Sequence, residues 1–172
     1  MKFLSLVILA IAFAGSPAAA QSLSERAASA VGLTPSSQSF VESVAISDMF
    51  EIESSKIAQQ SANAKVRQFA EHMIAGHSKT SAELKGIAAK LNIQVPAAMD
   101  RSHQSMVDDL KDEKGSDLDT KYADMQITAH KDAISLFERY ASGGENAELK
   151  AWASKTLPDL KAHLTMAEDL KK

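Results

Sequence analysis

The sequence predicts an all-α protein built as a four-helix bundle. In four long segments, apolar side chains recur at alternating spacings of three and four residues, the pattern of a helix with one buried face. Residues that start or stop helices bound these segments. Nothing in the chain shows the strict apolar–polar alternation of a half-buried strand.

Residues 1–20 have the pattern of a signal peptide. Lys2 precedes a near-continuous apolar run over residues 3–14, and small residues at positions 18–20 follow it. This pattern predicts export, with cleavage after Ala20. The apolar run is short for a membrane span, although an uncleaved N-terminal anchor is the alternative.

The composition excludes several classes of function. The formal net charge of −3 becomes one unit more negative without Lys2, so the chain lacks the basic surface that nucleic acid requires. No later segment has the 18 or so uninterrupted apolar residues of a transmembrane helix, so we expect none in the mature chain. The chain has no cysteine, so a metal would need histidine and carboxylate ligands.

The predicted bundle domain covers residues 39–172 and follows a flexible lead-in over residues 21–38. Ser39 and Glu42 have the spacing of a capping box, which predicts a first helix over residues 40–61. Asn63 is the predicted cap of the second helix, which extends to about Leu91.

A long connection follows, over residues 92–115. Pro96 is expected to end the second helix, and residues 105–111 to form one or two helical turns. A connection of this length is uncommon between antiparallel neighbours. It suits a ferritin-like bundle, in which one connection crosses from end to end between the second and third helices.

Caps and glycines bound the last two helices. Ser116 is the predicted cap of the third helix, and Gly143 and Gly144 end it. Asn146 is the predicted cap of the fourth helix. Pro158 falls inside that helix, where we expect a local kink.

Three histidines fall on the predicted buried faces, each near the middle of its helix: His77, His130 and His163. Their depths differ by no more than three residues, which at ~1.5 Å per residue is about 4–5 Å. The three imidazoles should therefore lie in one layer. Asp48 and Glu51 occupy buried-face positions near the middle of the first helix and are the candidate partners of the histidines.

Two interpretations of this layer remain open. His77, His130 and His163, with Glu51 or Asp48, have the donor atoms for a single zinc, iron or copper ion. Alternatively, a buried histidine–carboxylate network sets the register of the helices without binding anything. A di-iron site is not expected, because the chain has no Glu-x-x-His motif. We expect the other two histidines, His72 and His103, to be exposed.

The buried faces and their flanks resemble a known family. The resemblance covers roughly residues 40–170 and rests on these groups: residues 51–53, 66–70 and 77; 118–119, 122, 125, 130 and 136–138; and 149–151, 156–158, 160 and 163–164. It is to exported bacterial proteins grouped as domain of unknown function 4142, often labelled predicted outer membrane proteins. It implies a ferritin-like fold and a periplasmic location, and no established activity. The family usually has an acidic residue where this chain has Gly76.

The sequence therefore predicts a soluble periplasmic helical-bundle protein whose biochemical role it does not specify. The main interpretation is a non-enzymatic binding or envelope-homeostasis protein with a structural histidine layer and an unidentified protein or small-ligand partner. The alternative is a metal-binding or redox protein that uses the histidine–carboxylate site. A third possibility is a small-molecule carrier, which would need an apolar cavity beside the histidines.

Overall fold

The computed structural model describes residues 33–172. In this part of the chain there are five helices and no strand: α2 (Ser37–Ala58), α3 (Ala64–Lys90), α4 (Arg101–Lys111), α5 (Gly115–Gly143) and α6 (Ala147–Asp169). The all-α prediction is therefore confirmed. The predicted signal peptide and most of the predicted lead-in lie outside the described residues.

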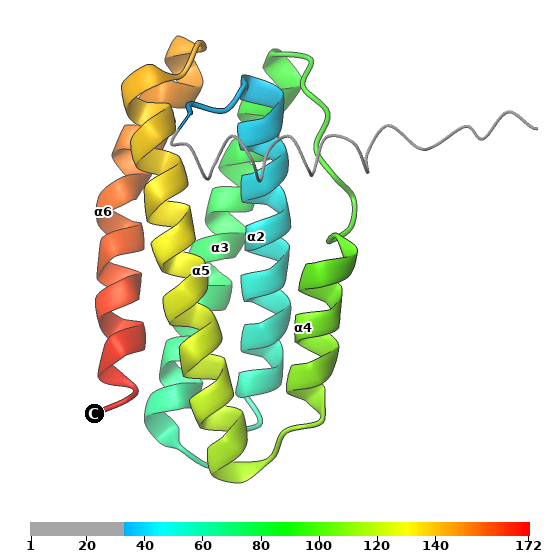
Figure 1. Cartoon of the computed structure of the whole chain (residues 1–172), viewed down its shortest axis with the longest axis vertical. Coiled ribbons are helices and arrows are strands. Elements are labelled where there is room, and N and C mark those ends of the chain that lie inside the picture. The colour runs from blue at the N-terminus through cyan, green and yellow to red at the C-terminus, as the bar shows by residue number, and fades with distance from the viewer. Residues whose placement is uncertain (1–32) are drawn as a thin grey trace, which may run out of the picture.

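Four long helices, α2, α3, α5 and α6, lie side by side with their axes nearly aligned (Figure 1). Consecutive helices run in opposite directions, so α2 pairs with α3 and α5 pairs with α6 through short connections. Contacts of α2 with α5, and a less extensive contact of α3 with α6, complete the packing. None of the described helices is long and apolar enough to cross a membrane.

The long connection contains a full helix where the sequence predicted one or two turns. Asp100 caps α4 by accepting a hydrogen bond from the His103 backbone N–H, so that α4 begins earlier than expected and packs against α2. Asp100, a favoured cap residue, is the sequence signal for this earlier start. As predicted, the connection returns the chain from one end of the bundle to the other (Figure 1).

Two predicted helix starts are wrong, and one helix end has a different cause from the predicted one. Ser36 rather than Ser39 caps α2, so that the helix begins within the predicted lead-in; it ends at Ala58. The end of α3 is set by Asn92, which adopts a left-handed φ of 55° while Ile93 N–H bonds to the Ala88 carbonyl. Pro96 therefore lies beyond the helix end.

The second wrong start is that of α5. This helix begins at Gly115 without a side-chain cap, so Ser116 is its second residue and does not cap it. The caps at Asn63 and Asn146 and the stop at Gly143 and Gly144 are as predicted. Pro158 lies inside α6, and the kink expected there remains a prediction.

The core consists of two apolar clusters separated by a polar layer. One cluster is built around Phe40, Phe137 and Trp152, near the end where α2 begins. The other includes Phe69 and Tyr122, nearer the opposite end. His77, His130 and His163 each fall between the segments of their own helix that supply the two clusters.

Candidate metal centre

The structure brings the three predicted histidines together. His77 from α3, His130 from α5 and His163 from α6 are 3%, 0% and 8% exposed. Their ring centroids form a nearly equilateral triangle with sides of 5.6, 5.5 and 5.4 Å. Each ring presents one nitrogen within 4.8 Å of the nitrogens of the other two. The fixed rise of the helix therefore places the imidazoles in one layer, since all three occupy buried-face positions at similar depth.

Glu51 supplies the fourth side of this layer from α2. Its side chain is fully buried, at 0% exposure. The carboxylate oxygen Oε2 forms a close ion pair with His77 Nε2 and lies 3.6 Å from His130 Nε2. One carboxylate oxygen therefore faces two imidazole nitrogens at once.

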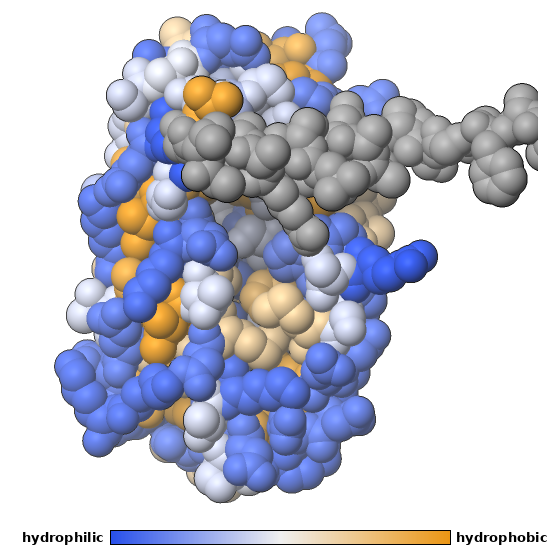
Figure 2. Space-filling model, viewed as in Figure 1, coloured by the Kyte–Doolittle hydropathy of each residue, from blue (hydrophilic) through white to orange (hydrophobic). Residues whose placement is uncertain are grey.

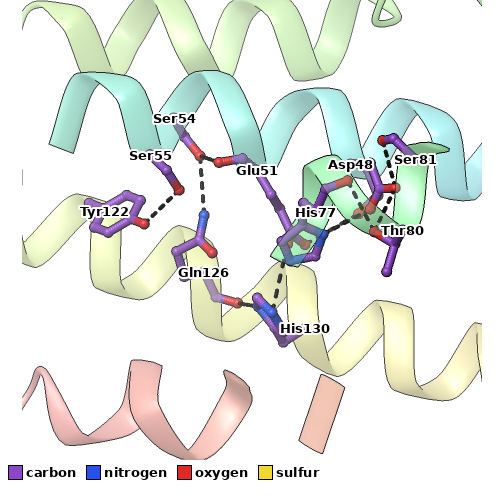
Figure 3. Close-up of polar contacts among 11 residues, drawn as sticks. Asp48, Glu51, Ser54, Ser55, His77, Thr80, Ser81, Tyr122, Gln126 and His130 are labelled. Atoms are coloured by element: carbon purple, nitrogen blue, oxygen red, sulfur yellow. Dashed lines mark hydrogen bonds and ion pairs between the residues drawn. The ribbon is translucent and has the colours of Figure 1, made fainter. Parts of the chain in front are cut away.

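Asp48 lies behind His77 and fixes its orientation. Its Oδ1 accepts a hydrogen bond from His77 Nδ1 at 2.8 Å. Its Oδ2 accepts hydrogen bonds from Thr80 Oγ1 at 3.0 Å and Ser81 Oγ at 2.9 Å (Figure 3). Both oxygens of Asp48 are thus engaged, and the bond to Nδ1 leaves His77 Nε2 as the nitrogen directed at Glu51. Glu53, two residues from Glu51, is exposed and pairs with Lys56.

His130 is oriented by its own helix. Its Nδ1 donates to the Gln126 backbone carbonyl at 2.9 Å, so Nε2 is the nitrogen that faces Glu51. The Gln126 side chain donates to Ser54 Oγ at 3.1 Å, and Ser54 in turn donates to the Glu51 carbonyl (Figure 3). This network links α5 to α2 next to the histidine layer.

Sequence reasoning missed these supporting residues. Gln126 and Tyr122 precede His130 by four and eight residues, so helical spacing places them on the same face of α5. Both are fully buried, and the Tyr122 hydroxyl lies 2.7 Å from Ser55 Oγ. That spacing was the available signal, although it does not specify the partner on α2.

Four buried atoms in the layer have no hydrogen-bond partner: Glu51 Oε2, His77 Nε2, His130 Nε2 and His163 Nδ1. His77 Nε2 and Glu51 Oε2 nevertheless face each other as a close ion pair. Buried polar atoms in folded proteins are nearly always hydrogen-bonded. Four buried nitrogen and oxygen atoms outside any hydrogen bond, one from each long helix, suit the coordination of a cation.

Without a metal ion, the layer distributes charge unequally. Burial opposes ionisation of Glu51, but the neighbouring His77 and His130 hold the pKa of this carboxyl at about 2. Burial likewise opposes protonation of His77, but Glu51 and the hydrogen bond to Asp48 raise its pKa to about 10. Burial and repulsion by the other two histidines lower the pKa of His163 to about 3. The metal-free layer therefore contains a Glu51–His77 ion pair and a neutral His163.

A cleft of about 890 Å³ approaches the layer between α2 and α5. Asp48, Glu51 and His77 line its inner end, and Ala133 and Phe137 belong to its apolar wall. Figure 2 shows a hollow on this face, with weakly apolar side chains inside and hydrophilic side chains around it. The polar layer is therefore enclosed by the bundle but borders a space large enough for a small molecule.

The remaining two histidines lie outside the triangle. His103, at the start of α4, is one-third exposed, bonds to Asp100 and packs edge-on against Phe50. His72 is exposed, as predicted, yet its ring centroid lies 5.1 Å from that of His163. His72 is therefore the exposed histidine that touches the layer.

The chain belongs to the family described as Domain of unknown function (DUF4142), whose model matches residues 22–170. This finding confirms the resemblance seen in the sequence. No curated protein sequence matches the chain.

A solved structure described as CopM in the Cu(II)-bound form has a similar fold. Its TM-score is 0.68 at 18% sequence identity, and the match covers 80% of this chain and 96% of that one. At this identity the likeness concerns the fold, which is thus all-α and CopM-like.

Proposed function

We propose that this protein binds one transition-metal ion in the polar layer. The ligands are His77 Nε2, His130 Nε2, His163 Nδ1 and a carboxylate oxygen of Glu51, while Asp48 holds His77 in position. The observation that carries the proposal is the set of four buried nitrogen and oxygen atoms, none of them hydrogen-bonded, that converge from four helices. Three imidazoles and one carboxylate form a donor set typical of zinc, copper and iron sites.

The metal-binding interpretation is better supported than a purely structural layer. A structural network stabilises a fold when its polar atoms are hydrogen-bonded, and here four central ones are not. The similar fold of CopM, described as Cu(II)-bound, makes copper(II) the first metal to test. Copper(II) also binds nitrogen and oxygen sites more tightly than the other divalent first-row ions. Zinc and iron are the alternatives.

We infer that the mature protein works in the periplasm after cleavage following Ala20, and that its bundle is of the ferritin-like type. The role that fits these inferences is metal binding in the cell envelope, as part of metal homeostasis there. We assign no reaction to the site. A redox role would require the bound ion to change oxidation state, which potentiometry of the loaded protein would measure.

Metal analysis of untagged protein, purified from periplasm without chelator, tests the proposal. We expect about one equivalent of one transition metal, or uptake of one equivalent on titration of metal-free protein with Cu(II). His130→Ala should weaken the affinity by more than about 100-fold, because it removes a ligand rather than a supporting group. His103→Ala is the matched control and should keep wild-type affinity. Absence of uptake by the wild type, or undiminished affinity in His130→Ala, would overturn the proposal.

The cleft favours a second candidate function, the carriage of a small organic molecule. Its volume of about 890 Å³ is within the range of small-molecule sites, and it has apolar walls with polar groups at its inner end. Native mass spectrometry of protein from periplasm would detect a co-purifying ligand. Ala133→Phe should displace such a ligand by filling the cleft, and would leave the four metal ligands in place.

A further inference from the structure

One of the three layer histidines lies next to the protein surface. His163 is the most exposed of them, at 8%. Its Nδ1 is buried and unpartnered. The Cε1–Nε2 edge of its ring faces α3 at Gly76, where an added Cβ would lie 3.1 Å from His163 Cε1 and 3.5 Å from Nε2. The missing side chain at Gly76 therefore gives this imidazole the space to lie against the α3 backbone.

His72 continues this contact to the solvent. It precedes Gly76 by four residues, so the two lie on the same face of α3. The exposed ring of His72 meets the ring of His163 edge-on, with centroids 5.1 Å apart and an interplanar angle of 83°. The rings of His77 and His130 lie 5.5 and 5.4 Å from His163 on its other side. Imidazoles thus form a continuous series from the surface of α3 to the buried layer.

We propose that His72 and His163 form the route by which a metal ion enters and leaves the buried site, at the seam between α3 and α6. His72 binds the hydrated cation at the surface. His163, which lies between His72 and the other two histidines, takes it over and remains its ligand inside. Each transfer exchanges a ligand of the ion for an imidazole nitrogen, and no electron moves. This inference rests on the proposed metal-binding function and adds the path and the residue that serves it.

The packing of the helices supports a route at this seam. The contact of α3 with α6 is less extensive than the contacts within the α2–α3 and α5–α6 pairs. On the opposite side of the histidine layer, toward α2, Glu51 and His77 are 0% and 3% exposed. Both oxygens of Asp48 are engaged there by hydrogen bonds. A cation that arrived there would meet no unengaged exposed histidine, since His103 is bonded to Asp100.

Loading and release kinetics of copper(II) test the route. Stopped-flow mixing of metal-free protein with Cu(II), followed by the fluorescence of Trp152, the single tryptophan, measures loading. Mixing of the loaded protein with excess EDTA measures release. In His72→Ala we expect both rates to fall on the order of tenfold while Kd stays unchanged. A residue on the path alters the transition state, which loading and release share, and leaves the end states untouched. His103→Ala is the control and should keep both rates.

The outcomes separate this inference from the proposed function. Wild-type rates in His72→Ala overturn the route and leave metal binding intact. A raised Kd in His72→Ala also overturns it, because His72 would then be a ligand of the final site. Slower loading in His103→Ala with normal rates in His72→Ala would place the route in the cleft between α2 and α5. Failure of the wild type to take up metal removes the proposed function and the route with it.

Because His72 is exposed, we expect its substitution to leave the helical circular dichroism unchanged.

Discussion

Substitution of Glu51 by glutamine should remove the charge that holds the metal-free layer together. Glu51 is fully buried and pairs with His77 Nε2, while its Oε2 also lies 3.6 Å from His130 Nε2. Glutamine preserves the shape and removes the negative charge. Breaking a buried ion pair by neutralising one partner typically costs about 3–5 kcal/mol, because the other charge is left uncompensated. We expect a loss in this range in the free energy of unfolding at pH 7.

The pH dependence of stability makes this prediction specific. Burial lowers the pKa of His77, but attraction by Glu51 outweighs it and raises the folded-state pKa from 6.5 to about 10. The stabilisation from protonated His77 is therefore fully present below pH 6.5 and is lost as the pH rises through about 10. Each pKa unit corresponds to about 1.4 kcal/mol, so the wild type should lose on the order of 4 kcal/mol over this range. Most of this loss should disappear in Glu51→Gln, because Glu51 is the main group that raises the pKa of His77.

Urea unfolding followed by circular dichroism, in EDTA at pH 6.5, 8 and 9.5, measures both effects. The matched control is Glu53→Gln, two residues along α2, where the side chain is 45% exposed and pairs with Lys56. This variant should stay within about 0.5 kcal/mol of the wild type at every pH. A wild-type stability that is constant from pH 6.5 to 9.5, or an equal alkaline loss in Glu51→Gln, would refute the reasoning.

Two further predictions concern the neighbours of this ion pair. Burial and its histidine neighbours lower the pKa of His163 from 6.5 to about 3, so it stays neutral in the folded protein while the unfolded chain takes up a proton. Metal-free protein should therefore lose stability as the pH falls from 6.5 towards 3, and His163→Asn should lose less; equal acid sensitivity in urea unfolding would contradict this. Asp48→Asn should weaken Cu(II) binding about 10- to 100-fold, because Asp48 accepts the His77 Nδ1–H bond that orients the ligand. Isothermal titration calorimetry measures this change, and an unchanged Kd would show that Asp48 does not position His77.

Much of the fold followed from the spacing of apolar residues. The predicted buried faces of the four long helices are indeed the buried ones, including the polar members Asp48 and Glu51. Two asparagine caps and one glycine stop were also predictable, because each meets a local backbone requirement.

Helix starts that compete with near neighbours were harder to predict. Ser36 and Ser39 are both serines with cap potential, and the sequence does not show which one the chain uses. The full length of α4 is hard to predict from sequence, because its buried residues, Val107 and Leu110, are few and become buried only against other helices. Helix starts of this kind depend on tertiary packing as well as on local propensity.

By itself, the sequence determined that His77, His130 and His163 lie on buried faces at one depth, because the period and rise of a helix are local properties. Only the tertiary structure decided the role of each neighbour. It placed Glu51 on the fourth side of the layer and Asp48 behind His77, and it brought the exposed His72 to the edge of His163. Those relations depend on how each helix is rotated about its axis and on which helices pack together. Such rotations result from side-chain packing across the whole core, so no single helix sequence specifies them.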